Sequence, residues 1–270
     1  TGVVPSELRL LDHVKELMDY SRATADIYTR FATQYLSDSD GYSILNCAGA
    51  FHQSLEGAFD IPSWIPDWRA RAKFKPLLTS YFKAGLDPPY HSAPIKIEGN
   101  RLTAAGLAVD MVKSQLGPRN SSLEPEDVLD FMLQCQEMLP GYHDNSPGVA
   151  YAFGKTLVAG HAFAGFEVDP GELEDGELPM EGFFEIASAP NQETWADELQ
   201  DLCRTRSFAD LMWSKKAHGY FQMASNAMDG RAFFRTYQGI FGIAPDGIQQ
   251  GDMVAILYGT RTPFILRRVD

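Results

Sequence analysis

The chain has 270 residues, and at roughly 150 residues per domain this length allows one or two domains. Hydrophobic residues make up 44% of the composition and aromatic residues 12%, enough to build a core, so the bulk of the chain is not intrinsically disordered. A formal net charge of −13 repels nucleic acid and anionic membrane surfaces, and neither is expected as a partner.

Residues 1–60 have the periodicity of helices. Apolar side chains recur every three or four positions between residues 7 and 20, as they do on one face of a helix. Ile27, Phe31 and Tyr35 repeat this spacing in a second segment, which stops at a Ser-Asp-Ser-Asp-Gly run. We therefore expect two amphipathic helices in this part of the chain.

Residues 93–116 are expected to be rich in β structure. Ile95 and Ile97 alternate with polar residues ahead of a Gly99-Asn100 turn, and the alternation resumes after the turn. This pattern predicts a hairpin followed by a strand.

Residues 124–230 return to helical spacing. We expect helices at residues 124–139, 148–163 and 192–216, whereas the acidic and turn-rich residues 169–185 are expected to form a solvated loop. The apolar stripe of the first of these helices comprises Val128, Met132, Cys135 and Leu139.

Residues 231–270 again favour β structure. Short apolar runs at residues 233–236, 239–243, 253–258 and 264–268 are separated by turns that contain Gly, Pro or Asp. They predict an antiparallel meander. The whole chain, residues 1–270, is therefore expected to be a single α+β domain in which a helical bundle packs on a small antiparallel β-sheet or partial barrel.

Few residues point to catalytic chemistry of a familiar kind. The chain contains no GxSxG, GxGxxG, GxxxxGK[ST] or HExxH run, and its histidines and cysteines lack metal-ligand spacing, so no metal and no cofactor are expected. Three widely separated cysteines are typical of a reducing compartment, which favours a cytoplasmic location. The longest apolar stretch, residues 149–166, is interrupted by Lys155 and His161, so no membrane span is expected.

Aromatic side chains are the candidates for a binding site. Trp64 and Trp68 lie in a segment that prolines keep extended, where their rings either close the edge of a core or line a pocket. Later in the chain, strand alternation places Arg235 and Tyr237 on one face and Phe234 on the other. One of these faces is expected to lie in the core and the other to be accessible.

Several segments resemble fungal heterokaryon incompatibility (HET) proteins. They are residues 7–17, 26–32 and 61–69, the Thr-Leu-Val-Ala-Gly run at 156–160, and the tail at 231–267. These resemble, in order, the segment that follows the HET core, a mid-region Thr-Leu motif and the closing β segment of the family. The core itself, with its Ser-Tyr-x-Trp-Gly, Trp-Ile-Asp and Cys-Ile-Asn-Gln runs, is absent, as is the closing Tyr-Val-x-Gly-type segment. The chain is expected to be either a fragment or a relative that has lost the signalling part.

The resemblance implies two alternative functions. The first is a small-molecule cyclase of fungal secondary metabolism, because HET-like proteins include pericyclases; it would be a cofactor-free enzyme of the intramolecular Diels–Alder type acting on an apolar, terpenoid-like substrate. The second is a non-catalytic regulatory or interaction fragment of a self/non-self recognition protein. The abundance of rings and the lack of a nucleophile motif favour the cyclase, since a concerted cycloaddition needs mainly shape and one or two hydrogen bonds.

For the cyclase, the positions of these motifs indicate a site. The expected walls of the substrate pocket are Trp64, Trp68, Phe234 and Tyr237. His161 or Arg235 is expected to donate a hydrogen bond to a carbonyl of the substrate and so to activate it.

Overall fold

The computed structural model describes residues 21–37, 43–51, 61–69, 82–85, 95–117, 125–139, 147–160, 182–183 and 215–268. Its helices are α2 (Thr24–Ser37), α3 (Ser43–Phe51), α4 (Pro125–Glu137), α5 (Pro147–Leu157) and α9 (Lys215–Met228). Its strands are β1 (Lys96–Glu98), β2 (Arg101–Thr103), β3 (Gly106–Leu116), β4 (Arg231–Thr236), β5 (Phe241–Pro245), β6 (Met253–Leu257) and β7 (Phe264–Leu266). The expected α+β class, with helices packed on a partial barrel, is confirmed.

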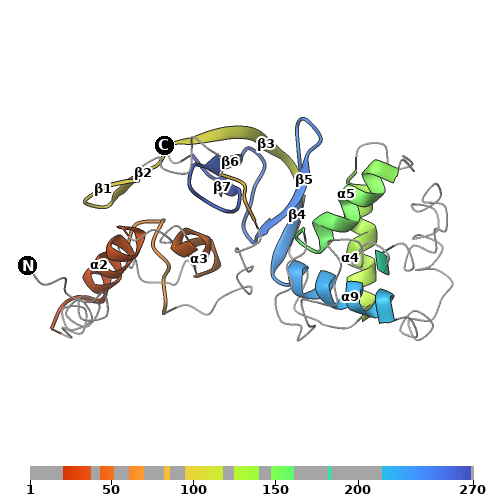
Figure 1. Ribbon diagram of the computed structural model, residues 1–270, viewed down its shortest axis with the longest axis horizontal. Coiled ribbons are helices and arrows are strands. Elements are labelled where there is room, and N and C mark those ends of the chain that lie inside the picture. The colour runs from red at the N-terminus through yellow and green to blue at the C-terminus, as the bar shows by residue number, and fades with distance from the viewer. Residues whose placement is uncertain are drawn as a thin grey trace, which may run out of the picture.

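The strands form two antiparallel sheets. β1 and β2 make a hairpin whose turn contains Gly99 with a φ of 59°, as the sequence predicts. The other five strands form a curled sheet in the order β5-β4-β3-β6-β7 (Figure 1). The expected meander is wrong at one place, because β5 and β6 are consecutive in the chain but are not neighbours in the sheet.

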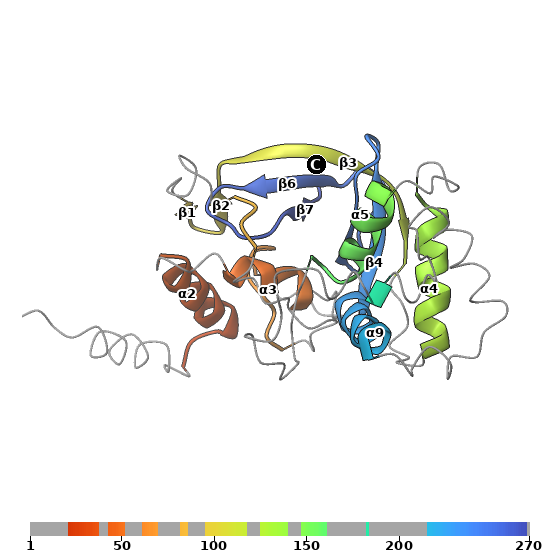
Figure 2. The same cartoon turned by 45° about the vertical axis from the view of Figure 1, so that its right-hand side comes forward.

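The long strand β3 joins the two C-terminal hairpins. Its first half pairs with β6 from Gly106 to Met111, and its second half pairs with β4 from Val112 to Leu116. Register shifts occur at residues 108–110 and 112–114. Such irregularities bend a strand and increase its twist, so β3 arches over the molecule and reaches both hairpins (Figure 2).

Helices lie at both ends of this curled sheet. α4, α5 and α9 gather beside β4 and β5, whereas at the other end α3 lies near β7 and α2 lies beneath the β1–β2 hairpin (Figures 1 and 2). Each group has its own hydrophobic cluster on the sheet. A third cluster lies on the side of the sheet that carries Phe234, which we call the inner face. Its buried members are Val112, Ala232, Phe234, Ala244, Ile248 and Val254.

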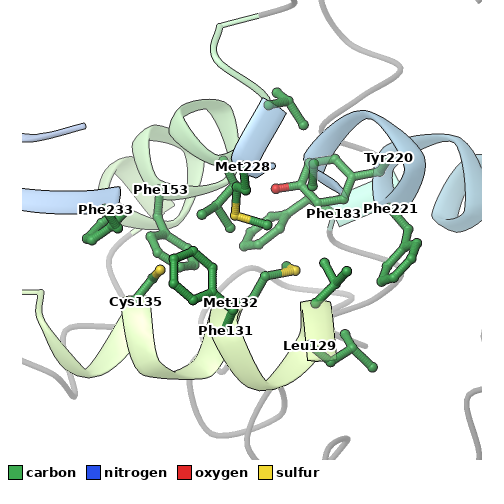
Figure 3. Packing of buried hydrophobic residues seen from close by; sticks show 14 of the residues in the cluster. Leu129, Phe131, Met132, Cys135, Phe153, Phe183, Tyr220, Phe221, Met228 and Phe233 are labelled. Carbon is green, nitrogen blue, oxygen red and sulfur yellow. The ribbon is translucent and has the colours of Figure 1, made fainter. Parts of the chain in front are cut away.

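The cluster under α4, α5 and α9 follows from the apolar stripe of α4. All four predicted stripe residues are buried in it, and Phe233 of β4 closes the cluster from the sheet side (Figure 3). Tyr220 of α9 is fully buried, and its hydroxyl donates a hydrogen bond to the carbonyl of Gly154 in α5 at 2.8 Å. This bond satisfies a buried polar group and sets α9 against α5.

Several helical predictions are confirmed and others are corrected. The second expected helix and the helix at 124–139 correspond to α2 and α4. The helix expected at 148–163 ends early, at Leu157, because Ala159 and Gly160 adopt positive φ values of 51° and 68°. The amide of Gly160 donates to the carbonyl of Lys155, which closes the last turn in a Schellman-type arrangement.

Several other expected elements lie wholly or mostly outside the described residues. The helix at 7–20 lies outside the described residues, as do nearly all of the loop at 169–185 and of the helix at 192–216. α3 and α9 are not among the expected helices, although both lie in parts of the chain expected to be helical. The buried residues Ala217, Tyr220, Ala224 and Met228 of α9 recur every three or four positions, so its sequence does carry a helical pattern. In the described part of the chain, no helix is long and apolar enough to cross a bilayer.

Candidate functional site

The tryptophan loop packs against the N-terminal helices. Trp64 and Trp68 both contact the cluster beneath α2 and α3, and Trp64 Nε1 donates to the carbonyl of Asn100 at 3.0 Å. The ring of Trp68 lies edge-on to those of Tyr28 and Phe31, with centroid separations of 4.9 and 5.4 Å. Both tryptophans therefore close the edge of a core, which is one of the two alternatives that the sequence leaves open.

Charged groups hold this loop in place. The carboxylate of Asp67 accepts two hydrogen bonds from the guanidinium of Arg69, at 2.9 and 2.7 Å, and a third from the backbone amide of Arg69. The hydrogen bond to Asp67 also raises the pKa of Arg69. A bidentate pair of this kind fixes the loop without adding a reactive group.

The two neighbouring phenylalanines of β4 point to opposite faces of the sheet. Phe233 is fully buried beneath the helices, and Phe234 is 6% exposed in the inner-face cluster. The alternation is confirmed, but the expectation of one accessible face is wrong at these two positions, because helices cover one side of β4 and the curl of the sheet covers the other.

We call the face that carries Phe233 the outer face of the sheet. Arg235 lies on it, opposite Ser114 of β3 and Phe241 of β5 in the strand register. Among the described residues, no atom accepts a hydrogen bond from the buried Nε of Arg235. A buried donor left without a partner costs about 1–3 kcal/mol, so an acceptor that reached this atom would be bound favourably.

Tyr237 continues the outer face one residue beyond β4. Its backbone amide donates to the carbonyl of Met111, which extends the pairing of β3 with β4, and its side chain is 56% exposed. The tight turn that follows contains Gly239, whose φ of 91° is one that glycine adopts without strain. The side chain of Gln250 donates to the Tyr237 hydroxyl at 3.0 Å.

An apolar stripe crosses the outer face between the two groups of helices. Leu266 of β7 pairs with Met253 of β6, Met253 pairs with Met111 of β3, and the carbonyl of Met111 accepts a hydrogen bond from the amide of Tyr237. Three neighbouring strands and the residue after a fourth therefore contribute one large side chain each. Met111 is 48% exposed, and Met253 and Leu266 are half-buried. We call Leu266, Met253, Met111 and Tyr237 the outer-face stripe.

The structure brings only two of the six predicted site residues together. Arg235 and Tyr237 share the outer face, Phe234 lies on the inner face, and Trp64 and Trp68 pack with α2. α5 ends before position 161, and His161 lies outside the described residues.

Sequence patterns did not single out Met111, Met253 or Leu266, whereas Tyr237 was expected at the site. Isolated methionines and a leucine at strand positions look like core residues, and only the strand pairing shows that Met111, Met253 and Leu266 adjoin on one face.

The described residues offer little for covalent or metal chemistry. No group of three potential metal ligands occurs among them. Burial raises the pKa of the Cys47 and Cys135 thiols, which keeps both protonated and poorly nucleophilic. The arrangement is suited to recognition by apolar contact and hydrogen bonding.

Comparison with known families identifies the C-terminal part of the chain. Residues 180–270 match the family model of the Het-6 beta-barrel domain. No curated protein and no solved structure matches the chain. The matched segment contains β4 to β7 but not β3. Over this segment the chain is similar to the Het-6 beta-barrel domain, which supports the resemblance to HET proteins.

Proposed function

We propose that the chain is a binding module of a heterokaryon-incompatibility-type protein and that its outer-face stripe is the contact surface for a partner protein. The observation that carries this proposal is the exposure of Met111 and Tyr237 side by side on a hydrogen-bonded sheet. Large apolar side chains that adjoin on a rigid surface mark interaction sites, since exposing them to water is unfavourable.

Strand pairing gives the stripe the properties of a preformed site. Backbone hydrogen bonds hold all four positions, so little conformational entropy is lost when a partner docks on them. Methionine and tyrosine suit such a surface, because the first adapts its shape and the second combines a ring with a hydroxyl.

Site-specific photo-crosslinking tests this proposal. A photoreactive residue at position 111 or 237 is expected to give the same crosslinked partner in an extract of the source organism, and Met111→Ser is expected to remove the product formed from position 237. The matched control is a photoreactive residue at Lys96, which is exposed on β1. Equal products from all three positions, or none from positions 111 and 237, would show that the stripe does not bind.

A second candidate is the cofactor-free cyclase of secondary metabolism, acting on a terpenoid-like substrate. The buried Arg235 Nε that lacks an acceptor favours it, because a preorganised donor stabilises charge that develops on a substrate carbonyl. In this proposal Tyr237, which shares the outer face with Arg235, is a pocket wall, and His161 remains the other possible donor.

Incubation of the purified chain with extracts of a pathway-blocked host tests the cyclase. The expected result is a cyclised product with the same mass as its precursor, formed more slowly by Arg235→Ala or His161→Ala. Conversion that neither substitution slows would rule out both donors, and the absence of any isomerised product would rule out the cyclase.

A further inference from the structure

A charged group lies on the same face as the outer-face stripe, and its chemistry restricts the partner. Arg235 precedes Tyr237 by two positions, so both side chains leave the same face of the sheet. Ser114, directly opposite Arg235 on β3, is exposed and adds a hydroxyl. An apolar surface thus adjoins a guanidinium whose Nε has no acceptor among the described residues.

We propose that the partner presents an acidic, apolar peptide segment, in which a carboxylate binds Arg235 while bulky side chains cover the outer-face stripe. This inference rests on the proposed binding function and names the chemical class of its partner. A carboxylate matches the planar fork of a guanidinium and forms charge-assisted hydrogen bonds that are stronger than neutral ones.

The charge distribution of the chain agrees with this choice. Residues 231–268 contain five arginines and two aspartates, with no lysine or glutamate, although the whole chain has a net charge of −13. At about 0.1 M salt, charges more than about 10 Å apart on the surface are largely screened. Acidic residues farther away than this therefore have little effect on a partner segment in contact with Arg235, and the nearby carboxylate of Asp110 already accepts hydrogen bonds from the amides of Met111 and Gln238.

Arg267, which follows Leu266 of the stripe in the chain, differs from Arg235. Arg267 already binds the carboxylate of Asp252 through its Nε and Nη2, at 2.8 and 2.6 Å. Its charge is compensated within the fold, so it has less to gain from a second carboxylate.

Selection from a phage-displayed library of random peptides tests the inference on the full chain. The peptides selected are expected to carry Asp or Glu beside bulky apolar residues. Binding of a selected peptide, measured by fluorescence anisotropy, should weaken about tenfold in Arg235→Gln, as for loss of one charge-assisted bond. Arg101→Gln, which removes the same charge from an exposed position on β2, should leave it unchanged.

Two further measurements distinguish a failure of this inference from a failure of the proposed function and from misfolding of the Arg235→Gln variant. Replacing Asp and Glu of the selected peptide by Asn and Gln should weaken its binding as much as Arg235→Gln does, although the protein itself is unchanged. If neutral peptides are selected and Met111→Ser abolishes their binding, the stripe binds partners but the acidic class is wrong. If no peptide is selected, or Met111→Ser has no effect, both proposals are overturned.

Discussion

At the scale of single residues, the carboxylate of Asp252 joins the end of β7 to the turn before β6. Its side chain is buried; it accepts two hydrogen bonds from Arg267 and one from the amide of Gln249 at 2.7 Å. Arg267 Nη2 also donates to the carbonyl of Gly247. These bonds reinforce the pairing of Leu266 with Met253 and hold the end of β7 against the turn between β5 and β6.

Replacing Asp252 by Asn should lower the free energy of unfolding by about 1–3 kcal/mol, the usual cost of removing one partner from a partly buried hydrogen-bonded pair. Half of the Arg267 side chain remains in water, which keeps the loss below that of a fully buried ion pair. Urea titration at neutral pH measures the change. Asp130→Asn, at an exposed position in α4, is the control.

The same carboxylate makes stability depend on pH. Burial raises the pKa of Asp252, but the hydrogen bonds from Arg267 and Gln249 outweigh it and lower the pKa overall; hydrogen bonds from Thr236 and Gln238 likewise lower the pKa of Asp110. A lowered folded-state pKa contributes stability above the unfolded value of about 3.9, and this is lost as pH falls through the folded value. Urea midpoints should therefore drop below about pH 4, less steeply in Asp252→Asn; equal slopes would contradict this.

At the scale of elements, the contact between β4 and β5 depends on a glycine. A Cβ at Gly242 would lie 2.9 Å from two atoms of the Phe234 ring, which is itself enclosed in the inner-face cluster. Gly242→Ala should therefore destabilise the protein by about 1–3 kcal/mol through overpacking.

Gly219 in α9 provides the matched control, because a Cβ there meets nothing within 4 Å. Gly219→Ala should stabilise the protein by about 0.5–1 kcal/mol through its higher helix propensity. Thermal unfolding of both variants measures the two effects. A Gly242→Ala variant as stable as the Gly219→Ala variant would show that the Phe234 ring gives way.

The strand β3 determines whether the matched segment can fold alone. Residues 180–270 hold both C-terminal hairpins, but β3, which pairs with one hairpin in each half, lies outside that segment. An isolated two-stranded hairpin is at best marginally stable in water. A fragment of residues 180–270 should therefore lack native sheet by circular dichroism, and a cooperative thermal transition in this fragment would contradict the prediction.

At the scale of the whole molecule, contacts distant in sequence join the early segments to the last strands. The amide of Gly85 donates to the carbonyl of Thr260, and the amide of Gly259 donates to the carbonyl of Gly85, both at 2.8 Å. The Thr262 hydroxyl lies 2.8 Å from the amide oxygen of Asn46 in α3. We therefore propose that residues 1–270 are one cooperative domain.

Unfolding followed by two probes tests this proposal. Far-ultraviolet circular dichroism and tryptophan fluorescence should give coincident urea transitions, as for two-state unfolding. Truncation of Thr262 to Ala should shift both curves together. Separate midpoints for the two probes would show that the parts unfold independently.

Local patterns account for the class and for many elements of this fold. The stripe of α4 and the glycine turns after β1 and β4 depend on neighbours within a few positions, so spacing and turn chemistry predict them. The same reasoning places Arg235 and Tyr237 on one face, because alternation is a property of any strand.

The remaining features of the fold and of the candidate site were determined by contacts between distant segments of the chain. Insertion of β3 between the hairpins, burial of both Phe233 and Phe234, and the meeting of Met111 with Tyr237 depend on segments more than a hundred residues apart. The sequence pattern of a strand states which side chains share a face, but it does not state which other strand or helix will cover that face. Tertiary packing made that choice, and it left Met111 and Tyr237 exposed on the outer face.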